Sequence, residues 1–373
     1  MLTFTQMDRF ESRILQFIKL RESVQIIGLP GTGKSRFIRD LISKVPKNTL
    51  VIYIDTNSLF DDFYIALLTF LGVQLNIQNL ENVNNNTHLV LTIKSKVEEI
   101  AKNQQILIII DSFTKLLDAK VPTIYKYLKH LRDINRKQIS YIFTTNNVGS
   151  PEDRNLIGDL FEIFSEHIEY IPIPTDKEFY KEVVHRANEL GFNPTQEQIK
   201  QIYSLSGKIH GLKKACIQAL RDSKRLDYRN NLRLKGQLEE LTEALTAEQL
   251  NYLISVSQEK DSDENRARTL RNLGLLTDSN KIRSGLLKQF VAQNYKSELT
   301  SAEKLFFDLL EQNKNTTITR KDICETVYPD VKNYEGITEH AIDQLVHRVR
   351  SKVSNKYKIE TIRGRGYRLI ENS

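Results

Sequence analysis

Short apolar runs rich in β-branched residues recur through the first half of the chain, separated by stretches with apolar residues three or four positions apart. Such runs predict strands, and the spacing between them predicts helices. Strands that alternate with helices indicate a parallel sheet covered by helices. The predicted strands span 23–27, 49–55, 105–112, 140–145 and 167–173.

The pattern changes twice in the second half. From 175 to about 232 it is helical, with Thr195 expected as an N-cap because Glu197 and Gln198 follow it. Residues 236–294 predict helices and a short hairpin. The end of the chain predicts a helix over 338–353, capped by Thr338, and a basic hairpin over 359–370. A helix followed by a basic hairpin is typical of a winged helix-turn-helix.

The octapeptide from Gly28 to Ser35 satisfies G-x-x-x-x-G-K-[ST] between a predicted strand and a predicted helix. Its glycines let backbone N–H groups surround phosphates at the positive end of the helix. Lys34 is expected to reach the β- and γ-phosphates, and Ser35 to ligate Mg²⁺. We therefore expect ATP or GTP binding, with contacts from Gly28, Gly31, Thr32, Gly33, Lys34, Ser35 and Arg36.

The third predicted strand ends in Asp111, where a Walker B aspartate holds the Mg²⁺ hydration shell. The fourth ends in polar residues and resembles the sensor-1 position of AAA+ and STAND-type ATPases. This resemblance implies that Thr145 and Asn146 sense the γ-phosphate or position water, unless they form a simple turn. It also implies a helical lid after the core. Arg154 is either an arginine finger acting on a neighbouring subunit or a surface arginine.

In most members of that class a glutamate follows the Walker B aspartate, whereas Ser112 stands here. Activation of water needs a carboxylate within reach of the reaction. Hydrolysis is therefore expected to be slow or to depend on another acid. Asp55, at the end of the second predicted strand, is the only comparable carboxylate.

The composition fits an ordinary globular protein of several domains: 373 residues, 40% apolar and 27% charged. The two cysteines, Cys216 and Cys324, lie in no metal-binding or disulfide pattern, so a reducing cytosol is expected. The apolar runs are too short to cross a bilayer, and no membrane partner is expected.

The formal charge of +7 gains meaning from its position. Residues 345–370 include one acidic residue, Glu360, and eight basic residues: Arg348, Arg350, Lys352, Lys356, Lys358, Arg363, Arg365 and Arg368. The rest of the chain is close to neutral. This concentration indicates a polyanion partner, with a solvated charged face as the alternative.

From Leu299 to Ile370 the chain resembles the OmpR-type effector domain of response regulators, most closely in Thr361-Ile362-Arg363-Gly364-Arg365-Gly366-Tyr367-Arg368-Leu369. The resemblance implies that residues 338–354 enter the major groove of DNA and that Arg363 reaches the minor groove. Three further cations are expected either to contact DNA or, equally, to pair with acidic residues inside the fold: Arg350, Arg368 and Lys358. The expected DNA contacts are His347, Arg348, Ser351, Lys352, Thr361, Arg363 and Arg365.

Together these features predict an α/β P-loop NTPase of the AAA+ type with a helical lid, followed by two winged-helix domains. The expected boundaries are 1–174 for the core, 175–233 for the lid, 234–297 for a degenerate winged helix and 298–373 for the OmpR-type domain.

The leading hypothesis is a transcriptional regulator that binds ATP and Mg²⁺, recognises double-stranded DNA under nucleotide control, and forms a homo-oligomer on ATP binding. Its expected location is the cytoplasm, at the nucleoid. Two alternatives remain: an AAA+ initiator or loader acting in replication or transposition, and a STAND signalling or defence scaffold.

Overall fold

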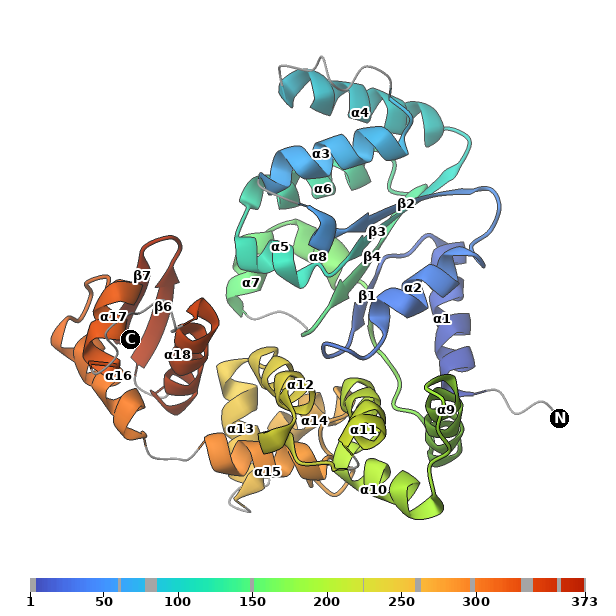
Figure 1. Cartoon of the computed structure of the whole chain (residues 1–373). Coiled ribbons are helices and arrows are strands. Elements are labelled where there is room, and N and C mark those ends of the chain that lie inside the picture. The colour runs from blue at the N-terminus through green and yellow to red at the C-terminus, as the bar shows by residue number, and fades with distance from the viewer. Residues whose placement is uncertain are drawn as a thin grey trace. The chain divides into compact units, whose positions relative to one another are not determined.

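A computed structural model describes residues 5–59, 62–77, 86–147, 151–223, 225–258, 263–295, 299–329, 338–353 and 357–371 (Figure 1). The chain divides into two compact units, Met1–Glu182 and Val183–Ser373. Within the described residues, no helix is long and apolar enough to cross a membrane.

A five-stranded parallel sheet forms the centre of the first unit and confirms the predicted fold class. Its strands are β1 (Val24–Ile27), β2 (Thr49–Asp55), β3 (Gln105–Asp111), β4 (Ile139–Thr145) and β5 (Ile168–Tyr170), in the order β2-β3-β4-β1-β5. Every residue of β3 and β4 is buried, as expected for a parallel sheet covered on both faces.

Two sets of helices cover the faces of this sheet (Figure 1). Leu107 and Ile109 of β3 pack with α1 (Gln6–Leu20) and α2 (Lys34–Ile42). Alternate residues of the same strand, such as Ile108, face the second set. That set comprises α3 (Phe63–Gln74), α4 (Asn86–Ile100), α5 (Thr114–Ala119), α6 (Pro122–Ile134), α7 (Pro151–Ile157) and α8 (Leu160–Phe164).

The strand order places β1 between β4 and β5, so the connection from β1 to β2 and the connection from β4 to β5 run in opposite directions across the sheet. In open α/β sheets this reversal opens a crevice at the carboxyl ends of the strands. The loop after β1 and the ends of β3 and β4 therefore meet at one edge of the sheet. A short 3₁₀ helix, η1 (Thr56–Ser58), follows β2 at the same edge.

Helix α9 (Asp176–Glu189) runs across the division into the second unit, which is helical up to Asn294. Thr195 caps α10 in a capping box with Gln198, which confirms the predicted N-cap. The predicted short hairpin is reduced to a single antiparallel bridge between Leu276 and Ile282. The remaining helices are α10 (Gln196–Ser206), α11 (His210–Ser223), η3 (Tyr228–Asn230), α12 (Leu232–Glu243), α13 (Ala247–Ser257), α14 (Glu264–Asn272) and α15 (Gly285–Asn294).

The C-terminal segment is a winged helix, as predicted. Three helices, α16 (Ser301–Gln312), α17 (Arg320–Val327) and α18 (Glu339–Val353), precede a hairpin of β6 (Tyr357–Ile362) and β7 (Gly366–Glu371). Their shared core includes Phe306, Leu345 and Tyr367.

Gly366 fixes where the hairpin meets the helices. Its φ is +139°, and a Cβ there would lie 1.9 Å from the carbonyl oxygen of Ile318. Ile318 forms an antiparallel bridge with Tyr367 beside it. Only glycine satisfies both the conformation and the close approach.

We expect Gly366→Ala to destabilise the hairpin by at least about 2 kcal/mol, because backbone strain and collision add together. Gly364→Ala is the matched control: its φ is +69° with no atom within 4 Å of a Cβ. The control should lose only about 1 kcal/mol. Hydrogen exchange of the 357–371 amides measures both, and equal protection in the two variants would contradict the prediction.

Candidate functional site

The loop Gly28–Ser35 joins β1 to α2 and has the backbone of an anion-binding turn. Gly31 and Gly33 have φ of 73° and 92°, which favours glycine at both positions. A Cβ at Gly28 would lie 2.7 Å from Thr32 Oγ1. No side chain caps α2, so its first N–H groups are available to an anion at the positive helix end. The loop fits a phosphate chain.

Lys34 lies against its own loop. Its Nζ donates to the carbonyl oxygens of Gly28 and Leu29, the second at 3.2 Å, and to Asn146 Oδ1 at 3.2 Å. The structure thus brings the P-loop lysine together with one predicted sensor residue. Of the next two loop residues, Ser35 is half-buried, whereas Arg36 is exposed beside Asp40.

Asp111 is fully buried at the end of β3, and its carboxylate accepts three hydrogen bonds. The donors are Thr144 Oγ1 at 2.5 Å, Tyr53 OH at 2.9 Å and the Ser112 N–H at 3.0 Å. Burial and the nearby carboxylate raise the pKa of Tyr53, which keeps the phenol as the donor. With Ser35, this carboxylate is the candidate holder of Mg²⁺.

The sequence placed Thr144 in the polar end of the fourth strand without pairing it with Asp111, and it gave no role to Tyr53. Both are polar residues inside strands that are otherwise largely apolar. A polar residue in such a strand indicates a buried hydrogen-bond partner, and this was the feature by which the sequence could have identified them. Their pairing with Asp111 depends on which strands are neighbours, and β3 lies between β2 and β4.

Ser112 occupies the position after the Walker B aspartate in a left-handed conformation, with φ of 60°. Its N–H also donates to Thr144 Oγ1 at 2.8 Å, and its Oγ accepts from Asn57 Nδ2 at 2.9 Å. Asn57 Nδ2 also donates to Asp55 Oδ1 at 2.8 Å. Because Asp55 is the register partner of Asp111, its carboxylate lies on the neighbouring strand end.

Thr145 and Asn146 have different surroundings. Thr145 Oγ1 is buried, accepts from Gln25 Nε2 at 2.8 Å and donates to the Asn147 carbonyl at 2.8 Å. It therefore holds the end of β4 in place, whereas Asn146 contacts Lys34. Arg154 is exposed, with its guanidinium 5.2 Å from the Phe161 ring centroid.

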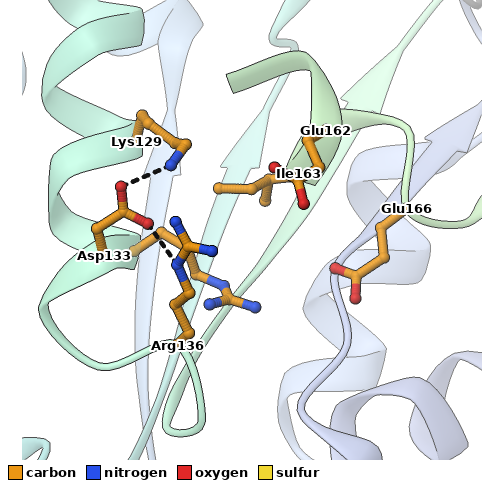
Figure 2. A pocket seen from close by; sticks show the side chains of 7 residues that line it. Lys129, Asp133, Arg136, Glu162, Ile163 and Glu166 are labelled. Carbon is orange, nitrogen blue, oxygen red and sulfur yellow. Dashed lines mark hydrogen bonds and ion pairs between the residues drawn. The ribbon is translucent and has the colours of Figure 1, made fainter. Parts of the chain in front are cut away.

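A cavity of about 110 Å³ lies between α6 and α8 (Figure 2). Asp133 pairs there with Lys129 and Arg136, and Arg132 Nε and Nη1 are buried without a partner in the described part of the chain. It lies where α6 leads into β4, at the edge of the sheet opposite the P-loop. Three cations face three carboxylates, so the lining is electrically balanced.

In the C-terminal domain, two predicted DNA contacts are held by a buried carboxylate. Glu303 of α16 pairs with Lys352 at 2.5 Å and with Arg348 at 3.2 Å. Burial opposes ionisation of Glu303, but the hydrogen bonds from Lys352 and Thr300 outweigh it and lower its pKa. The side chain of Lys352 is 3% exposed, so this lysine lies inside the domain.

Ser351 and His347 are also covered. Ser351 is 1% exposed, and its hydroxyl donates to the Arg348 carbonyl. Burial lowers the pKa of His347 to about 4. The expectation that Ser351 and Lys352 present polar groups to DNA therefore does not agree with their burial, because neither reaches solvent in this arrangement.

The hairpin keeps its predicted cations outside. Arg363 and Arg365 are exposed at the tip, and Thr361 is exposed beside them, accepting from Arg350 Nη2 at 2.5 Å. Internal pairing occurs for two cations, since Arg368 and Lys358 both lie beside Glu360, at 2.8 and 3.6 Å. Arg350 bonds to backbone and hydroxyl oxygens and to no acid that the structure describes.

Two family matches cover separate parts of the chain: residues 18–151 match the AAA domain family, and residues 294–369 match the family of transcriptional regulatory proteins, C terminal. A search of curated proteins found no match.

Among solved structures, the chain is similar to a Walker-type ATPase of Pyrococcus abyssi, at 15% identity, with 77% of this chain and 97% of that one covered and a TM-score of 0.49. It is also similar to the ORC1 protein of Aeropyrum pernix in complex with DNA, at 12% identity, 100% and 90% coverage and a TM-score of 0.48. The family matches show that this chain joins an N-terminal P-loop ATPase domain of the AAA type to a C-terminal winged-helix domain of transcriptional regulatory proteins.

Proposed function

We propose that this protein is an ATP-binding transcriptional regulator in which nucleotide state controls DNA binding by the C-terminal winged helix. The observation that carries the proposal is the joining, in one chain, of a formed P-loop site and a winged helix with two exposed arginines at its tip. Its place of action would be the nucleoid, in the cytoplasm.

Nucleotide binding is proposed to use the loop amides and Lys34. The amides hold the α- and β-phosphates, while the Lys34 ammonium exchanges its carbonyl contacts for phosphate oxygens. Ser35 and Asp111 would hold Mg²⁺, which neutralises phosphate charge when bound. Thr32, Gly33 and Arg36 would complete the loop contacts, and Asn146, which accepts a hydrogen bond from Lys34, would sense the γ-phosphate.

Slow hydrolysis is part of the proposal. Ser112 offers a hydroxyl where water activation needs a carboxylate, and Asp55 is the neighbouring acid. A long-lived ATP state suits a switch, because the bound nucleotide then biases one arrangement of the chain over another. We also propose that ATP binding promotes self-association, with exposed Arg154 reaching the nucleotide of a second copy.

DNA binding is proposed to place the outward side of α18, with His347 and Arg348, in the major groove of a double helix and the hairpin tip in the minor groove. Arg363, Arg365 and Thr361 carry the wing contact in this proposal. Lys352 is left out because Glu303 holds its side chain inside the domain, and Ser351 because its hydroxyl donates to the Arg348 carbonyl.

Replacing Lys34 by alanine should weaken ATP binding about 100-fold, since a charge-assisted contact to phosphate is worth up to about 3 kcal/mol. The same change should remove the effect of ATP on DNA affinity. Titration with a fluorescent ATP analogue and a DNA-binding assay measure the two effects. Lys44→Ala, just beyond the C-terminal end of α2 and beside Glu11, is the control. If the unmodified chain bound DNA with the same affinity with and without ATP, nucleotide control would be refuted.

Ser112→Glu should raise the ATP hydrolysis rate about tenfold or more, because it supplies the missing general base. Ser112→Gln has the same size and no basic carboxylate, so it controls for strain at the positive φ. Phosphate release at saturating Mg²⁺ and ATP is the measurement. Equal rates for the two variants would show that the base is supplied elsewhere.

Arg363→Ala and Arg365→Ala should each weaken binding to duplex DNA and reduce the slope of log affinity against log salt by about 0.9, because each releases one counterion fewer. Lys314→Ala provides the control, since Glu371 already pairs with this cation at 2.9 Å. If the slope of log affinity against log salt were unchanged in both wing variants, the two arginines would not contact the phosphates of DNA.

A further inference from the structure

The outward side of α18 carries a regular row of polar residues. Ile342, Val346 and Val349 line the core side of this helix. The helical period of 3.6 places a second row on the opposite side. Its members are His340, Gln344, His347 and Ser351.

The end of α12 and the start of α13, which belong to the same compact unit as α18, contact this outward row. His340 Nε2 lies 3.9 Å from Glu243 Oε1, and Gln344 hydrogen-bonds to the same carboxylate. His347 hydrogen-bonds with the backbone of Leu245.

Burial follows the same row. Ser351 is 1% exposed although it lies opposite the core of its own domain. Nδ1 of His347 is buried without a partner among the described residues, and desolvation keeps its ring neutral at pH 7. Burial also raises the pKa of Glu243. The C-terminal part of the outward row, His347 and Ser351, is therefore enclosed, whereas the His340 side chain is 62% exposed and the wing arginines stay exposed.

A recognition helix reads DNA with the side that faces away from its core, and the major groove is about 12 Å wide, enough for one helix. A helix whose outward side is covered by α12 and α13 cannot enter that groove. The side chains in the covering contact are polar: a carboxylate, imidazoles and one amide. Polar contacts between domains of one chain resemble transient interfaces, so this contact can open and close.

We propose that Glu243 and Leu245, where α12 leads into α13, hold the outward side of α18 closed, and that this contact must open before the winged helix can bind DNA. The inference rests on the proposed function and names the step at which it is regulated. DNA and the α12–α13 segment compete for one surface in this scheme.

Two readouts on the full-length chain test the inference. Ser351→Cys places a thiol under the cover, and the native Cys216 and Cys324 are both buried, so maleimide labelling reports opening. Glu243→Arg removes the acceptor of Gln344 and adds a cation beside His340. Glu248→Arg makes the same charge change at a side chain that is 74% exposed and lies beside Arg266.

All chains in the labelling experiment carry Ser351→Cys, and the chain with this change alone is the parent. Labelling of the introduced thiol should be slow in the parent and when Glu248→Arg is added. It should be about tenfold faster when Glu243→Arg is added, at an unchanged melting temperature. Duplex DNA affinity, measured without the Ser351→Cys change, should rise about fivefold or more in Glu243→Arg alone.

The inference would be overturned if the parent were labelled as fast as the unfolded chain, or if the two charge variants were labelled at equal rates. It would also be overturned if Glu243→Arg were labelled faster than the parent while its measurable affinity for DNA stayed unchanged. If no variant binds DNA while the labelling rates still separate, the closed contact is supported and the proposed function is wrong.

Discussion

The buried carboxylate of Asp111 is the constraint on which the first unit depends. A carboxylate taken out of water without donors is strongly destabilising, so its environment must supply them. Tyr53 of β2, Thr144 of β4 and the N–H of Ser112 do so. These donors fix the ends of three neighbouring strands in one alignment, and that alignment forms the edge on which the P-loop lies.

The same hydrogen bonds limit the chemistry of the site. Ser112 is held by hydrogen bonds with Thr144, Asn57 and Thr56, in a left-handed backbone conformation that favours glycine, asparagine and aspartate. Lys34 and Asn146 are already in contact. The site is thus organised to recognise phosphate, while the group that would activate water is absent from its usual position.

The second unit depends on another buried carboxylate. Glu303 fixes α18 against α16 through Lys352 and Arg348, so two charges of the basic segment stabilise the domain. Two more pair with Glu360. The exposed basic surface is therefore smaller than the net charge suggests and lies at the hairpin tip. The outward side of α18 contacts the end of α12 and α13, which connects this helix of the winged-helix domain to the part of the chain that follows the ATPase domain.

The sequence by itself determined the parallel sheet, the P-loop, the buried strand that ends in Asp111 and the terminal winged helix. Each depends on local periodicity, on glycine conformation or on short-range spacing, which are properties of neighbouring residues. It also indicated that Arg368 and Lys358 had internal partners as an alternative to DNA. Only the tertiary structure decided that Thr144 and Tyr53 hold Asp111, that Glu303 holds Lys352, and that His347 hydrogen-bonds with the backbone of Leu245. These contacts join residues from 33 to more than 100 positions apart, and they depend on which strands and helices become neighbours, a result of packing the whole chain that no local pattern records.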